Sequence, residues 1–92
     1  MVPIHPGRIL RRELNTRQLS ANALARALRV PSGRIVDILN GKRSVTAETA
    51  LRLGRYFGNA PQFWINLQGQ YDLAVAMRDF GGLVEREVQT AA

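Results

Sequence analysis

Apolar residues recur along this chain at helical spacing, in short stripes separated by polar breaks. The segment PGRILRREL, residues 6–14, carries isoleucine and leucine on one helix face, so a first helix is predicted there. The polar run at 15–18 is expected to end that helix. Period-two alternation, which would indicate strands, is not a feature of any segment, and we therefore predict an all-α fold.

Two short helices with a sharp break between them are predicted within ALARALRVPSGRIVDILNGKR, residues 23–43. Ser20 is suited to cap the first of them, and its apolar stripe consists of Ala21, Leu24, Ala25 and Leu28. After the break at Arg29-Val30-Pro31, the second helix begins at that proline or at Ser32 and stops at Gly41. Its inward residues are expected to be Ile35, Ile38 and Leu39.

A fourth and a fifth helix complete the pattern. Thr46 is placed to cap the fourth, which ends at Gly58-Asn59, and Glu48 complements the dipole of its first turn. The fifth begins at Ala60-Pro61, is the longest of all, and is expected to end at Gly81-Gly82. The fold class is therefore a five-helix all-α domain.

Positive charge is concentrated in the N-terminal part of the chain. The 92 residues carry a net charge of +6. Residues 1–56 hold eleven Lys/Arg against three Asp/Glu, a balance of +8, whereas residues 57–92 hold two Arg and four acids, a balance of −2. Such asymmetry is typical of a protein that binds a polyanion through one surface and another partner elsewhere. Solubility alone is the alternative explanation.

The inventory of side chains argues against several classes of function. Without cysteine there are no disulfides or thiolate metal sites. His5 is the only histidine, and no acidic cluster surrounds it in the sequence, so we expect it to support the entry to the first helix and predict no metal or cofactor. Catalytic residue sets and membrane-length apolar runs are also missing. We expect a cytoplasmic protein that is not an enzyme.

Four aromatic residues are open to two interpretations: Phe57, Phe63, Trp64 and Tyr71. They could form a stacking platform for single-stranded nucleic acid. Because they are expected to cluster where the fourth helix meets the fifth, packing in the core or in a dimer contact is the favoured interpretation.

The two short helices around the break have the features of a helix-turn-helix. Ala25 would lie where the helices cross, while Val30, Ile35 and Ile38 would fill the wedge between them. The second helix would then place its first turn and outer face in the major groove of double-stranded DNA. The predicted DNA-binding residues are Ser20, Asn22, Ser32, Gly33, Arg34, Asp37, Asn40, Lys42 and Arg43. An ordinary solvated helical hairpin is the alternative.

These positions are assigned different roles. Arg34 is suited to a bidentate contact with guanine, and Asp37 to accepting from cytosine or orienting Arg34. Gly33 would let the backbone approach the groove closely. Lys42 and Arg43 would contact phosphates beyond the helix end, as would Ser20 and Asn22 at the start of the preceding helix.

The chain resembles the HigA-type antitoxins, which belong to the Xre-like, lambda-repressor-like helix-turn-helix proteins. The resemblance covers about residues 5–76 and is carried by HPGRILRREL, by LSANALARALRVPSGRIVDILNGKRSVTAETALRLGRYFG and by PQFWINLQGQYDLAVA. It implies a bacterial type II antitoxin that neutralises a cognate HigB/RelE-like ribonuclease toxin. It also implies a homodimer that binds a palindromic operator and represses its own operon, with contacts from Ser32, Gly33, Arg34, Asp37, Asn40, Lys42 and Arg43.

Two residues depart from the family pattern. Arg29 replaces a glycine in the turn, where a left-handed backbone would cost about 1 kcal/mol, so an adjusted turn is expected. Arg8 replaces the glutamate of an HPGE opening, which puts a toxin contact at that end in doubt. We assign residues 1–80 to the DNA-binding antitoxin domain with its dimerisation helix, and 81–92 to a C-terminal tail.

Two other functions remain open. One is a stand-alone Xre-like transcriptional regulator without a toxin partner. The other is a protein-interaction module whose basic face binds acidic partners.

Overall fold

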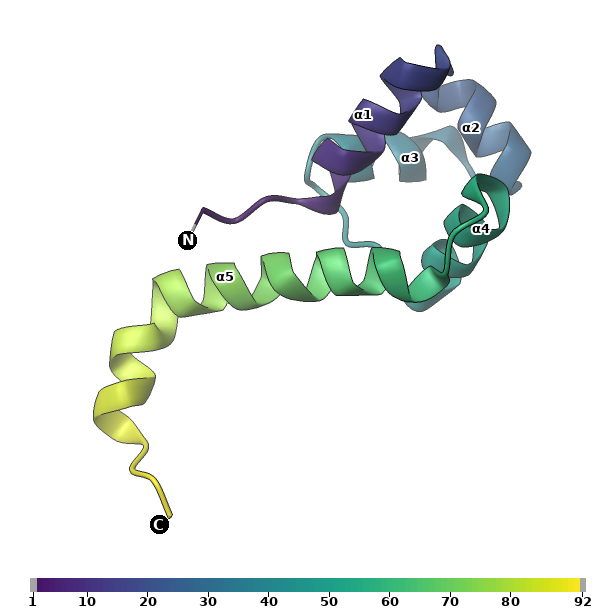
Figure 1. Ribbon diagram of the computed structural model, residues 1–92. Coiled ribbons are helices and arrows are strands. Elements are labelled where there is room, and N and C mark those ends of the chain that lie inside the picture. The colour runs from purple at the N-terminus through teal and green to yellow at the C-terminus, as the bar shows by residue number, and fades with distance from the viewer. Residues whose placement is uncertain (1, 92) are drawn as a thin grey trace.

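The computed structural model describes residues 2–91, and over that range the chain forms five α-helices (Figure 1). Their bounds are α1 Pro6–Arg17, α2 Ala21–Leu28, α3 Ser32–Leu39, α4 Ala47–Phe57 and α5 Pro61–Glu87. Helices α1 to α4 cluster on one side of the first half of α5, whose second half projects away from them and changes direction. The molecule is therefore elongated, about 50 × 22 × 22 Å. The predicted five-helix all-α fold is confirmed.

The core lies between α1 to α4 and the start of α5. Its largest fully buried side chains come from all five helices and include Leu10, Leu24, Ile35, Leu53 and Trp64. The Trp64 indole N–H donates to Asn59 Oδ1 at 3.0 Å, so the polar edge of this buried ring is satisfied. No helix within residues 2–91 is sufficiently long and apolar to cross a membrane.

The predicted aromatic cluster is only partly correct. Phe57 and Phe63 contact Trp64, with ring centroids 5.9 and 5.1 Å away, which favours the packing interpretation. Tyr71 is not part of this group, because two further turns of α5 carry it past the junction. Its ring instead meets His5 edge-on at 4.9 Å, beside the start of α1.

Side chains cap the helices where the sequence indicates. Ser20 Oγ accepts from the Ala23 amide at 3.0 Å, and Thr46 Oγ1 accepts from the Thr49 amide at 3.4 Å. His5 has the helix-entry role predicted for it, because its Nδ1 accepts from the Gly7 amide at 2.9 Å and caps α1.

Two predicted helix ends are wrong. Residues 15–17 do not break α1, because they contain no glycine or proline and because Arg17 pairs with Glu13 one turn earlier at 3.2 Å. Gly81-Gly82 does not end α5, since each glycine costs only about 1 kcal/mol in a helix interior and the helix continues to its last residue, Glu87. The functional division at residues 80 and 81 stays a prediction.

Candidate nucleic-acid interface

Helices α2 and α3 form the predicted helix-turn-helix. Ala25 is buried, Ile35 and Ile38 are fully buried, and Val30 is partly buried against the core that they share. The Val30 amide donates to the Ala25 carbonyl at 3.0 Å and so closes the end of α2. The wedge inferred from the sequence is therefore confirmed.

The turn between these helices keeps its left-handed residue. Arg29 adopts φ 62° and ψ 43°, so the expected adjustment of the turn does not occur. The unfavourable backbone conformation persists because the packed apolar residues on both sides of the turn fix the path of the chain. The exposed Arg29 side chain is thereby displayed at the turn.

The nine predicted DNA-binding residues fall on three adjoining parts of the fold. Seven are exposed, whereas Arg34 and Asp37 are half-buried. Four belong to α3, three to the residues just after it, and Ser20 and Asn22 lie at the end of α2 remote from the turn. Because Ser20 Oγ accepts from a backbone amide as a cap, its hydroxyl proton is free to be donated to a phosphate.

The start of α3 presents backbone amides together with small side chains. Pro31 occupies the N-cap position and has no polar side chain with which to cap the helix. Gly33 is exposed, and apart from its chain neighbours and the backbone of its own helix no described atom lies within 4 Å of a Cβ built on it. This turn can therefore approach a phosphate or a groove closely.

The segment after α3 turns outward through a glycine. Gly41 has φ +74°, and the Lys42 amide donates to the Asp37 carbonyl at 2.8 Å. Lys42 and Arg43 follow with exposed side chains. The chain thus leaves the recognition helix with two adjacent cations on its surface, as phosphate contacts require.

Arg34 is held by a residue that sequence reasoning did not assign to the site. Its Nη1 donates to Glu48 Oε1 at 3.0 Å, so in this structure Glu48 holds Arg34. Glu48 Oε2 accepts from Arg52 Nη2 at 3.2 Å. These two guanidinium groups lower the pKa of the Glu48 carboxyl below its ordinary value. In the sequence, Glu48 stood out only as an acid in the first turn of α4. Its favourable interaction with the helix dipole was sufficient to explain it there.

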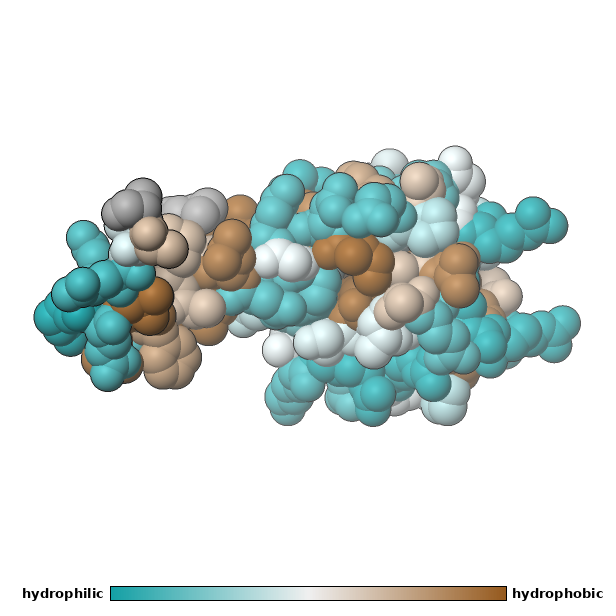
Figure 2. Space-filling model, turned by 90° about the horizontal axis from the view of Figure 1, so that it is seen from below, coloured by the Kyte–Doolittle hydropathy of each residue, from teal (hydrophilic) through white to brown (hydrophobic). Residues whose placement is uncertain are grey.

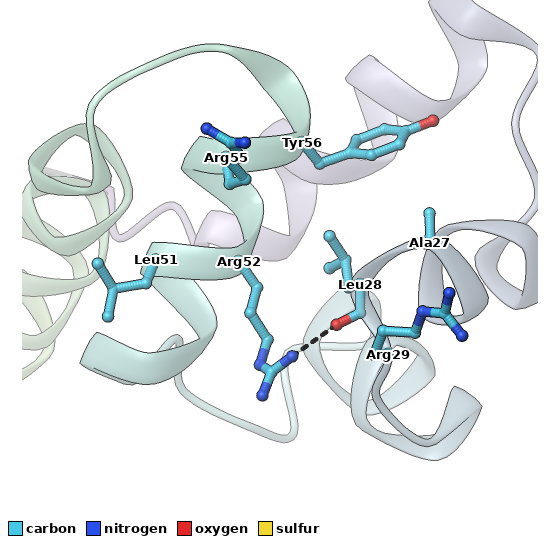
Figure 3. Close-up of a pocket in the computed structure, with 7 residues that line it drawn as sticks. All are labelled: Ala27, Leu28, Arg29, Leu51, Arg52, Arg55 and Tyr56. Carbon is cyan, nitrogen blue, oxygen red and sulfur yellow. Dashed lines mark hydrogen bonds between the residues drawn. The ribbon is translucent and has the colours of Figure 1, made fainter.

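Three arginines extend the basic surface beyond the predicted residues. An open cleft of about 540 Å³ lies between α2 and α4, and Figure 3 shows Arg29, Arg52, Arg55 and Tyr56 around it. Its apolar lining comes from Ala27, Leu28 and Leu51. The sequence assigned none of these arginines, because α2 and α4 are brought together only by the fold.

A second surface, on α5, is apolar. Leu73, Met77, Phe80 and Val84 are each more than half exposed and recur at intervals of four, three and four residues. Such spacing places them along one side of a helix. Figure 2 shows apolar residues gathered on the narrow projecting end of the molecule. We call these four residues the α5 stripe.

Comparison with known proteins places this geometry in context. The model of the helix-turn-helix family matches residues 8–64. Virulence-associated protein I of Dichelobacter nodosus is 54% identical over 80 residues, covering 86% of this chain and 74% of that protein.

Two structures are similar along nearly the whole chain. A HigA-family addiction module antidote protein from Coxiella burnetii is 50% identical with a TM-score of 0.95, covering 98% of this chain and 99% of that one. Pseudomonas aeruginosa antitoxin HigA with the higBA promoter is 46% identical with a TM-score of 0.96, covering 99% and 100%.

Proposed function

The chain belongs to the helix-turn-helix family and, within it, to the HigA-type antitoxins. We propose that it binds a palindromic operator as a homodimer, represses its own operon and neutralises a cognate HigB/RelE-like toxin. The family comprises DNA-binding regulators and antitoxins, not enzymes. The observation that carries the DNA-binding part is the recognition helix α3, whose exposed first turn is followed directly by Lys42 and Arg43.

In the proposed complex, α3 lies in the major groove with its N-terminal turn toward the base edges. Arg34 contacts a guanine, Gly33 permits close approach, and Ser32 and Asp37 complete the base-reading face. The phosphate contacts come from Ser20, Asn22, Lys42 and Arg43, with Asn40 at the helix end.

The α5 stripe supports a symmetric dimer. One recognition helix of eight residues spans only a few base pairs, whereas two helices held about 34 Å apart would read successive major grooves on one face of the DNA. The basic residues 1–56 are needed at the DNA, so the dimer contact is placed on the less basic α5. Exposed apolar side chains in a row are the chemistry expected of such an interface.

Substitutions in two cations separate the proposed roles on DNA. Arg34→Ala should weaken binding to a preferred duplex and relax the preference at one base position. Lys42→Ala should weaken binding to all sequences alike and reduce the salt slope by about one. Selection from a randomised duplex library, followed by titration at several salt concentrations, measures both effects. Equal loss of sequence preference in the two variants would contradict the assignment.

The proposal that this chain neutralises a toxin is based on its family membership. Expression of the chain together with the product of its neighbouring gene, followed by copurification, tests it directly. A stable complex in which the partner's ribonuclease activity is suppressed is the expected result. If the neighbouring product does not bind while the chain still selects a palindrome, the function is that of a stand-alone Xre-like regulator.

A further inference from the structure

Arg34 is the only side chain of α3 that is fixed in the structure by an ion pair to another helix. Its Nη1 meets Glu48 Oε1 at 3.0 Å, and Glu48 stands in the first turn of α4, fourteen residues further along the chain. A guanidinium has five N–H donors, and this bond uses one of them. The others remain for a bidentate contact with a base.

Glu48 is held in turn by a connection to α2. Arg52, one turn later on α4, bonds Glu48 Oε2 through Nη2 and the Leu28 carbonyl through Nη1 at 2.8 Å. Figure 3 shows this second bond reaching the end of α2. The Leu28 carbonyl is one of those left without a partner inside α2. The chain of bonds therefore joins α2, α4 and α3.

The Arg52 guanidinium is half-buried, and two of its three nitrogens are hydrogen-bonded. Its Nε is buried and, within the described residues, finds no hydrogen-bond partner. Leaving a buried donor unsatisfied is unfavourable, so the bonds to Leu28 and Glu48 are the ones that hold the group in this place. Glu48 is thereby connected through Arg52 to the backbone at the end of α2.

We propose that Glu48 is a positioning residue that fixes Arg34 for reading a base, and that Arg52 sets the position of Glu48. This inference rests on the proposed function of Arg34 on DNA. A free arginine side chain samples many rotamers and can reach several bases or phosphates, whereas a fixed guanidinium presents its donors in one direction. Glu48 therefore contributes to the choice of sequence while its own charge repels the DNA phosphates.

The ion pair between Glu48 and Arg34 adds little to the stability of the fold. The Glu48 side chain is 58% exposed, and exposed ion pairs contribute little to folding. An acid beside a DNA-binding surface also weakens binding to every sequence. Beyond its interaction with the dipole of α4, the orientation of Arg34 is therefore the effect that the carboxylate can supply.

The experiment compares four proteins with the unmodified chain: Glu48→Gln, Arg34→Ala, the double variant and Glu13→Gln. Glu13 is a matched control, because it is also an acid in an ion pair, here with Arg17 on α1, and that pair involves no residue of α3. Each protein is used to select duplexes from a randomised library, and the preferred duplex and a scrambled one are then titrated. Thermal unfolding followed by circular dichroism checks the fold of each variant.

Glu48→Gln should lower discrimination at the base read by Arg34 by about threefold to tenfold, a part of the full bidentate contribution. Its affinity for the scrambled duplex should be unchanged or higher, because a negative charge has been removed. Glu13→Gln should keep the original discrimination. In the Arg34→Ala background, Glu48→Gln should have no further effect at that base, since the residue that it positions is absent.

Three outcomes would overturn the inference. The first is that Arg34→Ala loses discrimination while Glu48→Gln keeps it, in which case the proposed function stands and the positioning role fails. The second is that Glu13→Gln and Glu48→Gln lose discrimination equally, which indicates a general effect of charge. The third is that Arg34→Ala changes no base preference, in which case base reading by Arg34 fails first. A fifth variant, Arg52→Lys, keeps the charge but has one nitrogen in place of the two that bond Leu28 and Glu48, and it should lose part of the discrimination.

Discussion

Gly7 allows α1 to lie directly against the backbone of α3, and a methyl group there should separate the two helices. A Cβ built on Gly7 overlaps the Ile38 carbonyl oxygen and lies 2.9 Å from its carbonyl carbon. It also lies 3.1 Å from Nδ1 of His5, the atom that caps α1. All three contacts are with atoms that the fold holds in place.

The magnitude follows from these contacts. Non-bonded heavy atoms prefer separations of about 3.5–4.0 Å, so α1 and α3 must move apart by more than about 1 Å where the Cβ meets the Ile38 carbonyl oxygen. Overpacking of this kind costs typically 1–3 kcal/mol, and disturbing the His5 cap adds about 1 kcal/mol. The better helix propensity of alanine offsets about 1 kcal/mol. Gly7→Ala should therefore destabilise the domain by about 1–3 kcal/mol, which lowers Tm by roughly 4–24 °C.

Gly33→Ala is the control, because apart from its chain neighbours and the backbone of its own helix no described atom lies within 4 Å of the added Cβ. Its Tm should be unchanged or slightly raised by the gain in helix propensity. Thermal unfolding followed by circular dichroism at one protein concentration measures both variants, since association would shift Tm. If Gly7→Ala unfolds at the same temperature as the unmodified chain, or if both variants lose stability equally, the close contact of α1 with α3 is wrong.

Three further predictions follow from other contacts. Burial lowers the pKa of His5 below 6.5, so the unfolded chain binds more protons than the folded one. The stability that the neutral ring contributes should therefore be present above about pH 6.5 and be lost as the pH falls below it. Urea unfolding should show a smaller loss of stability at low pH for His5→Asn, which keeps a cap acceptor and does not titrate. Leu73→Glu combined with Met77→Glu should give a folded monomer with reduced operator affinity, and sedimentation that shows the unmodified chain to be monomeric, alone and on a palindrome, would contradict the dimer. Trp64→Ala should cost about 3–5 kcal/mol, because a large, fully buried side chain is removed from the core, and a small change in its urea midpoint would contradict that packing.

Local signals were sufficient to predict most of the helices. Ser20 and Thr46 cap α2 and α4 as expected, because a cap depends only on residues three positions apart. The ends of α1 and α5 were harder to predict. A polar stretch such as 15–17 can remain helical, and so can a glycine pair such as Gly81-Gly82, since the cost is small compared with the contacts of the rest of the helix.

Arg29 illustrates a different difficulty. A single residue at a turn has its own backbone preference, and that preference predicted an adjusted path for the chain. In the structure the apolar wedge outweighs it, because Ile35 and Ile38 are fully buried and depend on the entry angle of α3. The packing on both sides of a turn therefore decides its geometry when the local cost is only about 1 kcal/mol.

Glu48 is missing from the predicted interface, because spacing within one helix cannot identify a partner on another helix. Spacing relates residues of the same helix, and on that basis Asp37 was expected to accept from cytosine or to orient Arg34, its neighbour on the same helix. Whether Arg34 meets Asp37 or Glu48 depends on the path of the chain between α3 and α4, where Gly41 takes a left-handed conformation. That path brings the first turn of α4 to the recognition helix, and an acid suited to the helix dipole then lies within 3.0 Å of Arg34. A residue with an adequate local explanation can thus have a second role that only the tertiary structure reveals.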